Sequence, residues 1–284
     1  MGHKYFGSIL EGKRAIITGA NKGLGLLMAR RFLDCGAKVA ILCAPFEEIE
    51  PAVKELQEID ANFEVLGYKP NLTDEAELAA MLDDIVAKWG GVDILVNNAG
   101  MYPTRTFEEY PKEVFEKVFD LNVTAPFVVT QQVLKVMKNN ENGGVVLNTS
   151  SMAGTAGAMR NIGYTASKHA VQGLTKGMAR ELGQYGIRVN GVAPAGIERT
   201  DVNGEVIPPQ ASSLDGYSQD MTKMMEAVQI SKKFCPLGTI QLHPDEYINA
   251  FIFLASDAAK FISGHTIEVN AAAIWPAASP ASCM

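Results

Sequence analysis

The sequence predicts an α/β protein: one domain with a doubly wound, seven-stranded parallel sheet and helices on both faces. Short apolar runs rich in β-branched residues alternate with amphipathic segments of about 12 to 25 residues, which is typical of βαβ units. A glycine-rich turn follows the first apolar run. The 284 residues, 47% of them hydrophobic and 20% charged, suffice for one large core.

Continuous apolar runs predict strands that are buried on both faces of a parallel sheet. In chain order these strands span residues 15–18, 38–42, 63–67, 94–97, 144–148, 188–192 and 266–269. Longer amphipathic segments lie between the runs and predict helices. These helices span residues 23–35, 47–59, 74–88, 112–138, 162–184 and 244–255.

No repeat or linker divides the chain, so residues 11–273 are expected to form the domain. Residues 1–10 are then an N-terminal extension and residues 274–284 a C-terminal tail. The segment of about 201–236 is rich in Ser, Gly, Pro and Met. It breaks the alternation of strands and helices and is predicted to be an insertion near the substrate.

Composition excludes several classes of partner. The net charge of −7 without a long Lys/Arg run argues against nucleic acid or an anionic membrane. No apolar stretch reaches membrane-spanning length, and residues 1–10 lack a signal-peptide core, so a cytoplasmic location is expected. The four cysteines and four histidines show no metal-ligand spacing, and no metal is expected.

The turn after the first strand reads Thr-Gly-Ala-Asn-Lys-Gly-Leu-Gly over residues 18–25. Glycines there permit a tight turn and a close backbone approach, and free amides at a helix N-terminus attract a pyrophosphate. The turn therefore predicts a dinucleotide site. Its candidate cofactor-binding residues are Gly19, Asn21, Lys22, Gly23, Leu24 and Gly25.

Tyr164 and Lys168 lie four residues apart in a predicted helix, so their side chains share one face. A nearby cation stabilises phenolate and lowers the tyrosine pKa from about 10 toward neutral pH, which suits a general acid or base. Ser151 lies thirteen residues before Tyr164. Its position just after a buried strand allows its hydroxyl to hold a substrate oxygen, although a turn or N-cap role also fits such a serine.

Five motifs in order resemble the short-chain dehydrogenase/reductase family, in its single-domain branch of about 250 residues. They are residues 18–25, the Asn-Asn-Ala-Gly of residues 97–100, Asn122, the Ser151–Tyr164–Lys168 set, and Arg-Val-Asn at 188–190 leading to Pro194. The resemblance covers about residues 10–270. It implies a Rossmann-type fold that binds NAD or NADP and interconverts an alcohol and a ketone.

The resemblance also implies a role for each catalytic residue. Tyr164 exchanges the proton, and Lys168 lowers its pKa and binds the nicotinamide ribose. Ser151 holds the substrate oxygen, and the backbone carbonyl of Asn122 holds a water that links Lys168 to solvent. The remaining cofactor contacts that it implies are Cys43, Asn71, Leu72, Asn98, Ala99, Gly100, Pro194, Gly196 and Ile197.

The chain departs from the family pattern at three places. Pro194-Ala195-Gly196 replaces the usual Pro-Gly, Asn71 stands where an aspartate is common, and residues 270–272 read Asn-Ala-Ala instead of Asp-Gly-Gly. These departures concern cofactor geometry and subunit packing. They leave the proton-transfer residues intact.

The residue after the second strand normally selects the cofactor, because a carboxylate there binds the free ribose and repels a 2′-phosphate. Cys43 occupies that place, and Ala44 follows where NADP enzymes often have arginine. Lys22 favours NADP(H), whereas Glu47 and Glu48 oppose a phosphate. We expect a narrow preference for NAD(H), with NADP(H) as the alternative.

Six large apolar side chains, three of them methionines, lie between 221 and 234 and predict a lid over a bulky apolar substrate. The same residues equally fit plain packing of a helix against the sheet. Met152, Met159 and Tyr102 are expected to add apolar walls. A hydroxysteroid or ketosteroid is the first expectation, and a sugar acid or polyol is the alternative.

A non-catalytic dinucleotide-binding regulator is the alternative of another class. The joint presence of Ser151, Tyr164, Lys168 and Asn122 argues for an enzyme. Family resemblance further implies a homo-oligomer, a dimer or homotetramer, formed through the helices over 112–138 and 162–184.

Overall fold

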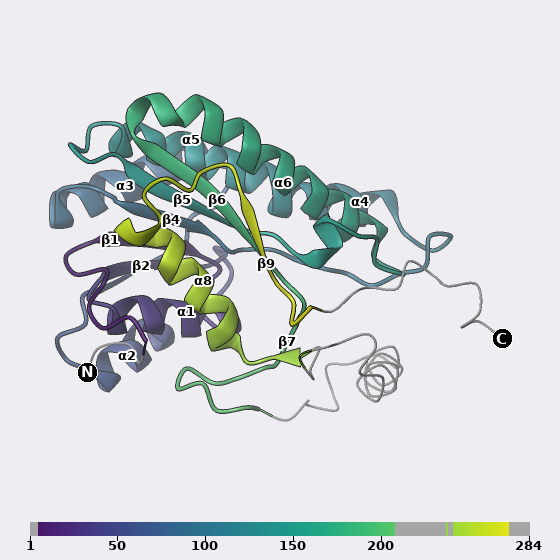
Figure 1. Ribbon diagram of the computed structural model, residues 1–284, viewed down its shortest axis with the longest axis horizontal. Helices are drawn as coiled ribbons and strands as arrows, with labels where there is room; N and C mark the ends of the chain where they lie inside the picture. The colour runs from purple at the N-terminus through teal and green to yellow at the C-terminus, as the bar shows by residue number, and fades with distance from the viewer. Residues whose placement is uncertain (1–4, 208–236, 238–240, 273–284) are drawn as a thin grey trace.

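The computed structural model describes residues 5–207, 237 and 241–272. Within them, a seven-stranded parallel sheet has the order β3-β2-β1-β4-β5-β6-β9 (Figure 1). The predicted α/β class and sheet are confirmed. The strands are β1 (Arg14–Thr18), β2 (Lys38–Leu42), β3 (Val65–Tyr68), β4 (Ile94–Asn97), β5 (Gly144–Thr149), β6 (Ile187–Pro194) and β9 (Thr266–Val269).

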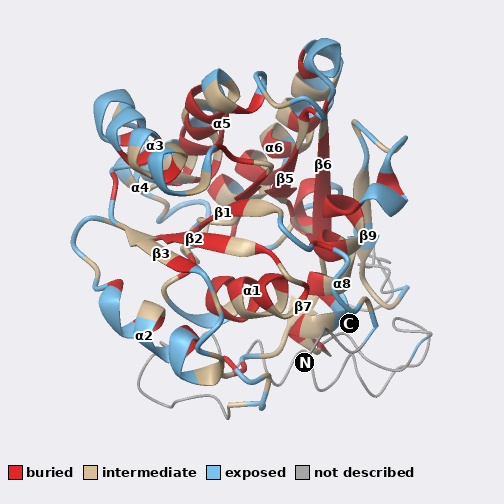
Figure 2. Ribbon diagram, turned by 90° about the vertical axis from the view of Figure 1, so that its left-hand side faces the viewer, coloured by how far each residue is buried: buried red, intermediate tan, exposed pale blue. Residues whose placement is uncertain are grey.

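Helices cover both faces of the sheet. The α-helices are α1 (Gly23–Asp34), α2 (Glu50–Ile59), α3 (Glu75–Trp89), α4 (Lys112–Phe119), α5 (Ala125–Met137), α6 (Ile162–Leu182) and α8 (Pro244–Ala255). One buried cluster joins the sheet to α1, α2 and α8, and a second joins it to α3, α5 and α6. The red central strands between paler outer helices in Figure 2 show this layering.

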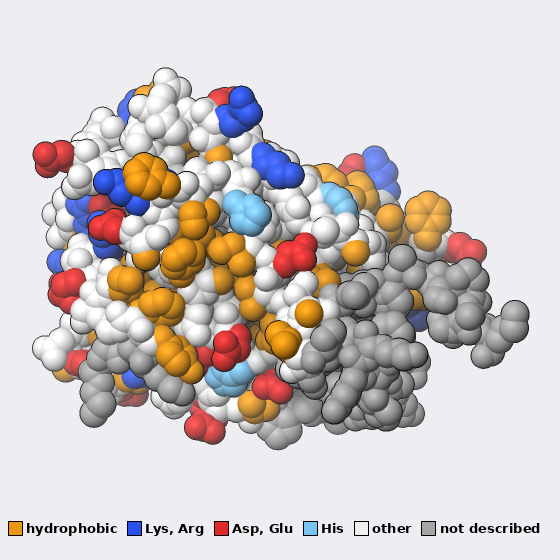
Figure 3. Space-filling model, in the orientation of Figure 1, with side chains coloured by type: hydrophobic (Ala, Val, Ile, Leu, Met, Phe, Trp, Pro, Cys, Tyr) orange, Lys and Arg blue, Asp and Glu red, His pale blue; other side chains and the backbone are white. Residues whose placement is uncertain are grey.

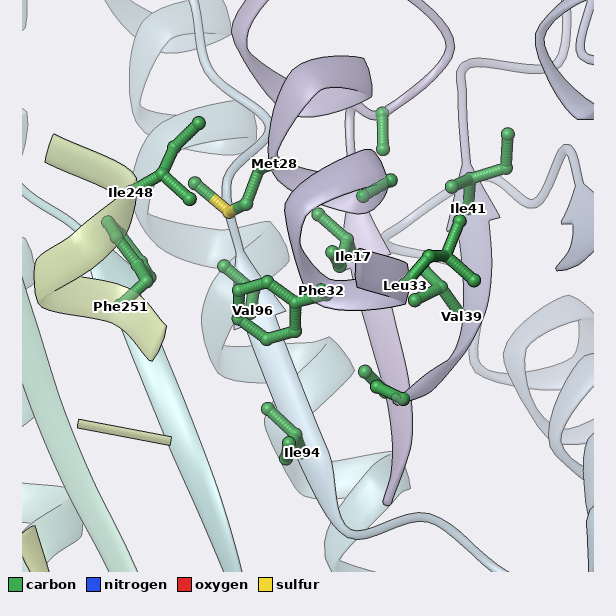
Figure 4. Packing of buried hydrophobic residues seen from close by; sticks show 14 of the residues in the cluster. Ile17, Met28, Phe32, Leu33, Val39, Ile41, Ile94, Val96, Ile248 and Phe251 are labelled. Atoms are coloured by element: carbon green, nitrogen blue, oxygen red, sulfur yellow. The ribbon is translucent and has the colours of Figure 1, made fainter. Parts of the chain in front are cut away.

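The first cluster is centred on α1. Phe32 of α1 lies near Val96 of β4, and Phe251 of α8 belongs to the same cluster (Figure 4). All three side chains are fully buried. Burial of each large apolar side chain stabilises the fold by about 1.5–3 kcal/mol, so this cluster fixes α1 and α8 against the sheet.

Strand β5 distributes its side chains to both layers in turn. Val145 and Leu147 join the cluster under α1 and α8, whereas Val146 joins the cluster under α3, α5 and α6. This alternation is the two-residue period of a strand. It sends the next two side chains, Asn148 and Thr149, toward α6 and α8 respectively.

The single α-helix expected over 112–138 is instead two α-helices joined by a π-helical segment, Asp120–Thr124. Pro126 has no N–H, so the α-helical bond from residue 126 to the carbonyl of Asn122 cannot form. The chain widens into a π turn there, a feature that is frequent at functional sites. Asn122 therefore lies at a break in the helix.

Smaller differences occur at other element ends. The helix expected over 47–59 begins at Glu50, and the strand expected over 63–67 is Val65–Tyr68. A two-residue parallel pair, β7 (Gly196–Ile197) with β8 (Gln241–Leu242), was not expected. It flanks the predicted insertion, of which only residues 201–207 are described.

The end of the predicted N-terminal extension is packed against the domain. Leu10 is fully buried, and its N–H donates to the carbonyl of Cys35 at 2.9 Å. Phe6 packs against the same cluster. The tail over 274–284 and the predicted methionine lid lie outside the described residues.

No helix in the described part of the chain is long and apolar enough to cross a membrane. On the face shown in Figure 3, acidic and basic side chains are scattered around an apolar centre. No continuous basic band crosses the coloured part of that face.

Candidate active site

The four predicted catalytic residues meet at the carboxyl edge of the sheet. Asn122 lies in the π segment, Ser151 directly after β5, and Tyr164 and Lys168 in the first two turns of α6. Gly100, in the loop after β4, lies between two of them. A Cβ added there would stand 3.2 Å from Asn122 Oδ1 and 3.8 Å from Lys168 Nζ.

Lys168 is buried, with 3% of its surface exposed. Its Nζ donates to the carbonyl of Thr149 at 2.7 Å and lies 5.4 Å from the centre of the Tyr164 ring. Burial disfavours the charged ammonium and lowers the pKa of Lys168 to about 8. The lysine therefore changes its charge close to physiological pH.

The pKa of Tyr164 differs from the sequence-based expectation. Burial is the largest effect and raises it, a hydrogen bond with the Ser151 hydroxyl lowers it, and Tyr102 raises it. The net lowering expected from the sequence is not found, because burial of the phenol outweighs the hydrogen bond that favours its ionised form. In this arrangement the phenol keeps its proton at neutral pH.

Ser151 combines the two roles expected for it. Its Oγ accepts from the N–H of Ala153 at 3.1 Å and caps a short 3₁₀ turn over Met152–Gly154. The same hydroxyl hydrogen-bonds to Tyr164. The cap fixes the serine side chain, so the tyrosine meets an oriented partner.

Asn122 acts through its side chain in this structure. Its Oδ1 accepts from the N–H of Met101 at 2.9 Å, and its Nδ2 donates to the carbonyl of Met101 and to Ser167 Oγ, both at 3.0 Å. Ser167 Oγ in turn donates to the carbonyl of Tyr164 at 2.8 Å. Asn122 thus connects the loop after β4 to the helix that carries the tyrosine.

A buried polar chain aligns the same elements below the site. Asn97 Nδ2 donates to Thr130 Oγ1 at 3.1 Å and to Asn148 Oδ1 at 2.9 Å, and Asn148 Nδ2 donates to Thr175 Oγ1 at 2.9 Å. All four residues are buried. Buried hydrogen bonds are costly to break, so the chain fixes α5 and α6 relative to β4 and β5.

The glycine turn holds the start of α1 against the sheet. Gly19 has a φ of +63° and Gly23 a φ of +55°, which side chains disfavour. A Cβ on Gly25 would lie 2.1 Å from the carbonyl oxygen of Gly19. Asn98 Nδ2 donates to the carbonyls of Thr18 and Gly19 at 3.0 and 3.1 Å, which fixes the turn.

The turn suits a dinucleotide pyrophosphate. No side chain caps the N-terminus of α1, whereas Asp74 caps α3 by accepting from two backbone amides. A Cβ on Gly23 would have no atom within 4 Å. Uncapped amides beside open space are the chemistry that binds phosphate. By contrast, the described residues contain no cluster of three His, Cys, Asp or Glu placed to hold a metal.

Comparison with known proteins agrees with this geometry. The family model described as short chain dehydrogenase matches residues 13–211. The chain belongs to the short-chain dehydrogenase/reductase family. The match spans both the glycine turn and the predicted catalytic residues.

Named relatives align with nearly the whole chain. A 3alpha-hydroxysteroid dehydrogenase of Mediterraneibacter gnavus is 41% identical, covering 93% of this chain and 98% of its own. A 7alpha-hydroxysteroid dehydrogenase of Escherichia coli is 35% identical, covering 92% and 94%. A 5-keto-D-gluconate 5-reductase of Escherichia coli is 32% identical, covering 92% and 95%.

A short-chain type dehydrogenase/reductase from Mycobacterium marinum has a similar structure. Its TM-score is 0.77 at 29% identity, and the match covers 94% of this chain and 97% of that one. With the family match, these similarities identify the chain as an NAD(P)-dependent short-chain alcohol dehydrogenase or ketoreductase that is hydroxysteroid dehydrogenase-like.

In this short-chain dehydrogenase, Cys43 directly follows β2 and packs inward. Cys43 is 3% exposed and packs into the first apolar cluster, and burial raises its pKa. Its side chain therefore belongs to the core. The polar group at the end of β2 is Glu47, whose Oε2 accepts from the N–H of Ala44 at 3.3 Å and whose Oε1 pairs with Lys22.

The Lys22–Glu47 pair connects the glycine turn to the loop after β2. The Lys22 side chain is 74% exposed and that of Glu47 23% exposed. Lys22 is the main cause of a lowered pKa at Glu47, so that carboxylate is ionised at neutral pH. Asn21 Nδ2 donates to the carbonyl of Glu48 at 3.4 Å across the same gap.

The other predicted cofactor residues line the same edge of the sheet. Asn71 Oδ1 accepts from the N–H and hydroxyl of Thr73, closing a turn before α3, and Leu72 packs on the second cluster. Ala99 N–H donates to Thr18 Oγ1 at 2.9 Å. The extra residue Ala195 extends the pairing of β6, since its N–H donates to Val269, and Gly196 and Ile197 form β7.

Three residues that hold the candidate site together were not among the site residues predicted from the sequence. Thr18 Oγ1 accepts from the N–H groups of Asn98 and Ala99, the Thr149 carbonyl binds Lys168, and Ser167 joins Asn122 to α6. Two of them are hydroxyl residues at the end of a buried strand. Their position at a strand end could have identified Thr18 and Thr149 as candidate site residues from the sequence, but it does not predict which groups they bind.

Proposed function

We propose that this short-chain dehydrogenase interconverts a hydroxysteroid and a ketosteroid with NAD(H), and that Tyr164 transfers the proton. The observation that carries the proposal is the convergence of Ser151, Tyr164 and Lys168 at one edge of the sheet. The open glycine turn lies at the same carboxyl edge. This is the crevice in which doubly wound sheets bind ligands.

In reduction, the Tyr164 hydroxyl gives its proton to the carbonyl oxygen of the substrate. The Ser151 hydroxyl, already bonded to Tyr164, holds the same oxygen. The Lys168 ammonium stabilises the phenolate that remains. When bound, the nicotinamide supplies the hydride in reduction and accepts it in oxidation. The raised pKa of Tyr164 keeps the phenol protonated and ready to act as the acid.

An apolar substrate is supported by exposed apolar side chains, one of which lies beside Tyr164. The Tyr102 ring lies 5.9 Å from the Tyr164 ring and is 70% exposed, and Met159 is 78% exposed. Met152, expected as a third wall, is only 7% exposed and packs inward. Large exposed apolar surface beside a polar centre suits a bulky alicyclic ligand. Relatives at 41% and 35% identity bear hydroxysteroid dehydrogenase names.

The proposed preference for NAD(H) is supported by Glu47. Its carboxylate lies near the end of β2. In the family, the acidic side chain that selects NAD is usually that of the first residue after this strand. There it can accept from a free ribose hydroxyl and repel a 2′-phosphate. Lys22, the only basic residue in the glycine turn, is engaged by that carboxylate.

The test is turnover by the purified protein on two substrate panels, one of hydroxysteroids and ketosteroids, the other of polyols and sugar acids. Steroid turnover that Tyr164→Phe abolishes by about a thousandfold or more, with NADH binding unchanged, is the expected result. Turnover confined to the second panel rejects the steroid assignment. NADH binding without turnover on either panel indicates the non-catalytic regulator instead.

A further inference from the structure

Tyr247, in the first turn of α8, is a fully buried phenol and the largest fully buried side chain in the described residues. Its ring packs edge-on against Phe251, with centroids 4.8 Å apart. Its hydroxyl donates to Thr149 Oγ1 at 3.1 Å. Burying a hydroxyl is costly unless it is hydrogen-bonded. Phenylalanine would fill this apolar site without that desolvation cost. The presence of a hydroxyl at this buried position therefore needs a structural or functional explanation.

The partner of Tyr247 is the residue that holds Lys168. Thr149 is the last residue of β5, and its carbonyl accepts from Lys168 Nζ at 2.7 Å. Its side chain points toward α8, on the face of the sheet opposite α6, as the alternation along β5 requires. Thr149 is thus in contact with one helix layer through its hydroxyl and with the other through its carbonyl.

The carbonyl of Thr149 lies beyond the last backbone pairing between β4 and β5. The N–H of Ser150 donates to β6, and in a trans peptide the preceding carbonyl points the opposite way, toward β4. Pairing between β4 and β5 ends at Asn97 and Asn148. The carbonyl is free to accept Lys168, and no strand bond on that side fixes its position.

We propose that Tyr247 is a positioning residue of the active site: its buried hydroxyl holds Thr149 and thereby orients the carbonyl that binds the Lys168 ammonium. The inference rests on the proposed role of Lys168. It connects α8, on the far face of the sheet, to the catalytic lysine through one residue. Burial, and to a smaller extent the Tyr164 phenol, raise the pKa of Tyr247, but the proposed route to Lys168 runs through Thr149.

The surroundings of Lys168 make the link measurable. From its own helix it faces Tyr164, from β5 the Thr149 carbonyl, and from the loop after β4 Gly100. No carboxylate contributes to its pKa, which burial lowers to about 8. A carbonyl acceptor favours the charged ammonium. When the carbonyl is less well held, the pKa of Lys168 is expected to fall further.

The test compares Tyr247→Phe, which keeps the ring and its packing, with wild type. The variant is expected to lower kcat about fivefold with KM within twofold. In ketone reduction, the fall in the variant's activity at alkaline pH is expected to occur about half a pH unit lower than in wild type. Thr149→Val removes the other partner while keeping the branched shape, and the same changes are expected.

The double variant with both substitutions separates a shared role from two independent ones. If Tyr247 acts through Thr149, the double variant loses no more kcat than either single variant, whereas independent effects multiply. Tyr68→Phe is the matched control. It also removes a phenol hydrogen bond, 2.6 Å to Asp84, but on β3, an outermost strand that β2, β1 and β4 separate from β5. Its kcat and pH profile are expected to match wild type.

NMR titration of ¹³C-labelled lysine, with Lys168→Met identifying the signal, gives a readout that needs no turnover. A shift of the Lys168 titration in Tyr247→Phe and Thr149→Val, absent in Tyr68→Phe, supports the positioning role even if the proposed steroid activity fails. An unchanged Lys168 titration together with unchanged kcat, or a multiplicative loss in the double variant, overturns it.

Discussion

At the scale of single residues, the site depends on a lysine that is buried without a carboxylate. Lys168 bonds to one carbonyl, and burial causes its lowered pKa. A buried carboxylate partner would restore the pKa and hold the ammonium permanently. The carbonyl instead leaves the charge of Lys168 close to its titration point.

The lowered pKa of Lys168 predicts opposite pH effects on activity and stability. In ketone reduction, kcat/KM is expected to fall as pH rises through about 8, because the charge that stabilises phenolate is lost. Stability is expected to rise from pH 8 toward 10.5. In that window the folded state has released the proton while the unfolded lysine, with its ordinary pKa of 10.5, keeps it. Activity profiles and denaturant unfolding between pH 7 and 10 measure the two effects.

Lys168→Met separates this lysine from other groups that titrate in the same window. The rise in the free energy of unfolding that is specific to wild type should be missing in the variant. Parallel stability curves for the two proteins would show that Lys168 keeps an ordinary pKa, contrary to the burial argument.

At the scale of elements, the start of α1 tolerates no side chain. A Cβ on Gly25 would meet the Gly19 carbonyl at 2.1 Å and Asn98 Nδ2 at 2.8 Å. Gly25→Ala is expected to destabilise the fold by about 3 kcal/mol, as overpacking does, and to weaken dinucleotide binding by moving the turn. Chemical denaturation and fluorescence titration with NADH measure these losses.

Gly177→Ala is the control for Gly25→Ala. Gly177 is exposed inside α6, and its added Cβ meets no atom within 4 Å. Alanine there is expected to stabilise the protein by about 0.5–1 kcal/mol through helix propensity and to leave NADH binding unchanged. Equal stability of the two variants would contradict the steric account of the turn.

The elements also separate what sequence patterns reveal from what they miss. All seven strands of the sheet are recognisable because each is a short apolar run bounded by breakers. The π segment at Asn122 is not predictable from the apolar periodicity, because that periodicity continues across it. Only Pro126 indicates an interruption of the α-helix. Element ends shift by a few residues because capping contacts, such as Asp74 on α3, decide them locally.

At the scale of the whole molecule, contacts between distant segments carry the information that motifs lack. Ser151, Tyr164 and Lys168 are predictable because their spacing along the chain encodes the site. Glu47 was seen only as a local charge, and its contact with Lys22 depends on two loops meeting after folding. Tyr247 lies 98 residues from Thr149, and no local pattern distinguishes its hydroxyl from a core aromatic.

Cofactor binding is expected to stabilise the whole fold, because a dinucleotide that binds only the folded state adds its binding free energy to stability. At a hundred times its Kd the gain is about 2.7 kcal/mol, which for a chain of this size raises Tm by roughly 5–10 °C. NADH should give this shift in wild type, and NADPH at the same concentration a smaller one. Thermal unfolding with each cofactor measures the difference.

Glu47→Gln tests which group sets that difference. Loss of the carboxylate removes the repulsion of a 2′-phosphate and frees the exposed Lys22 to pair with it. The Tm shift with NADPH should then rise toward that with NADH. Glu48→Gln removes the neighbouring exposed charge, which pairs with no basic group in the described residues, and should leave both shifts unchanged. If the two variants respond alike, the general negative potential of the loop selects the cofactor, and the placed carboxylate does not.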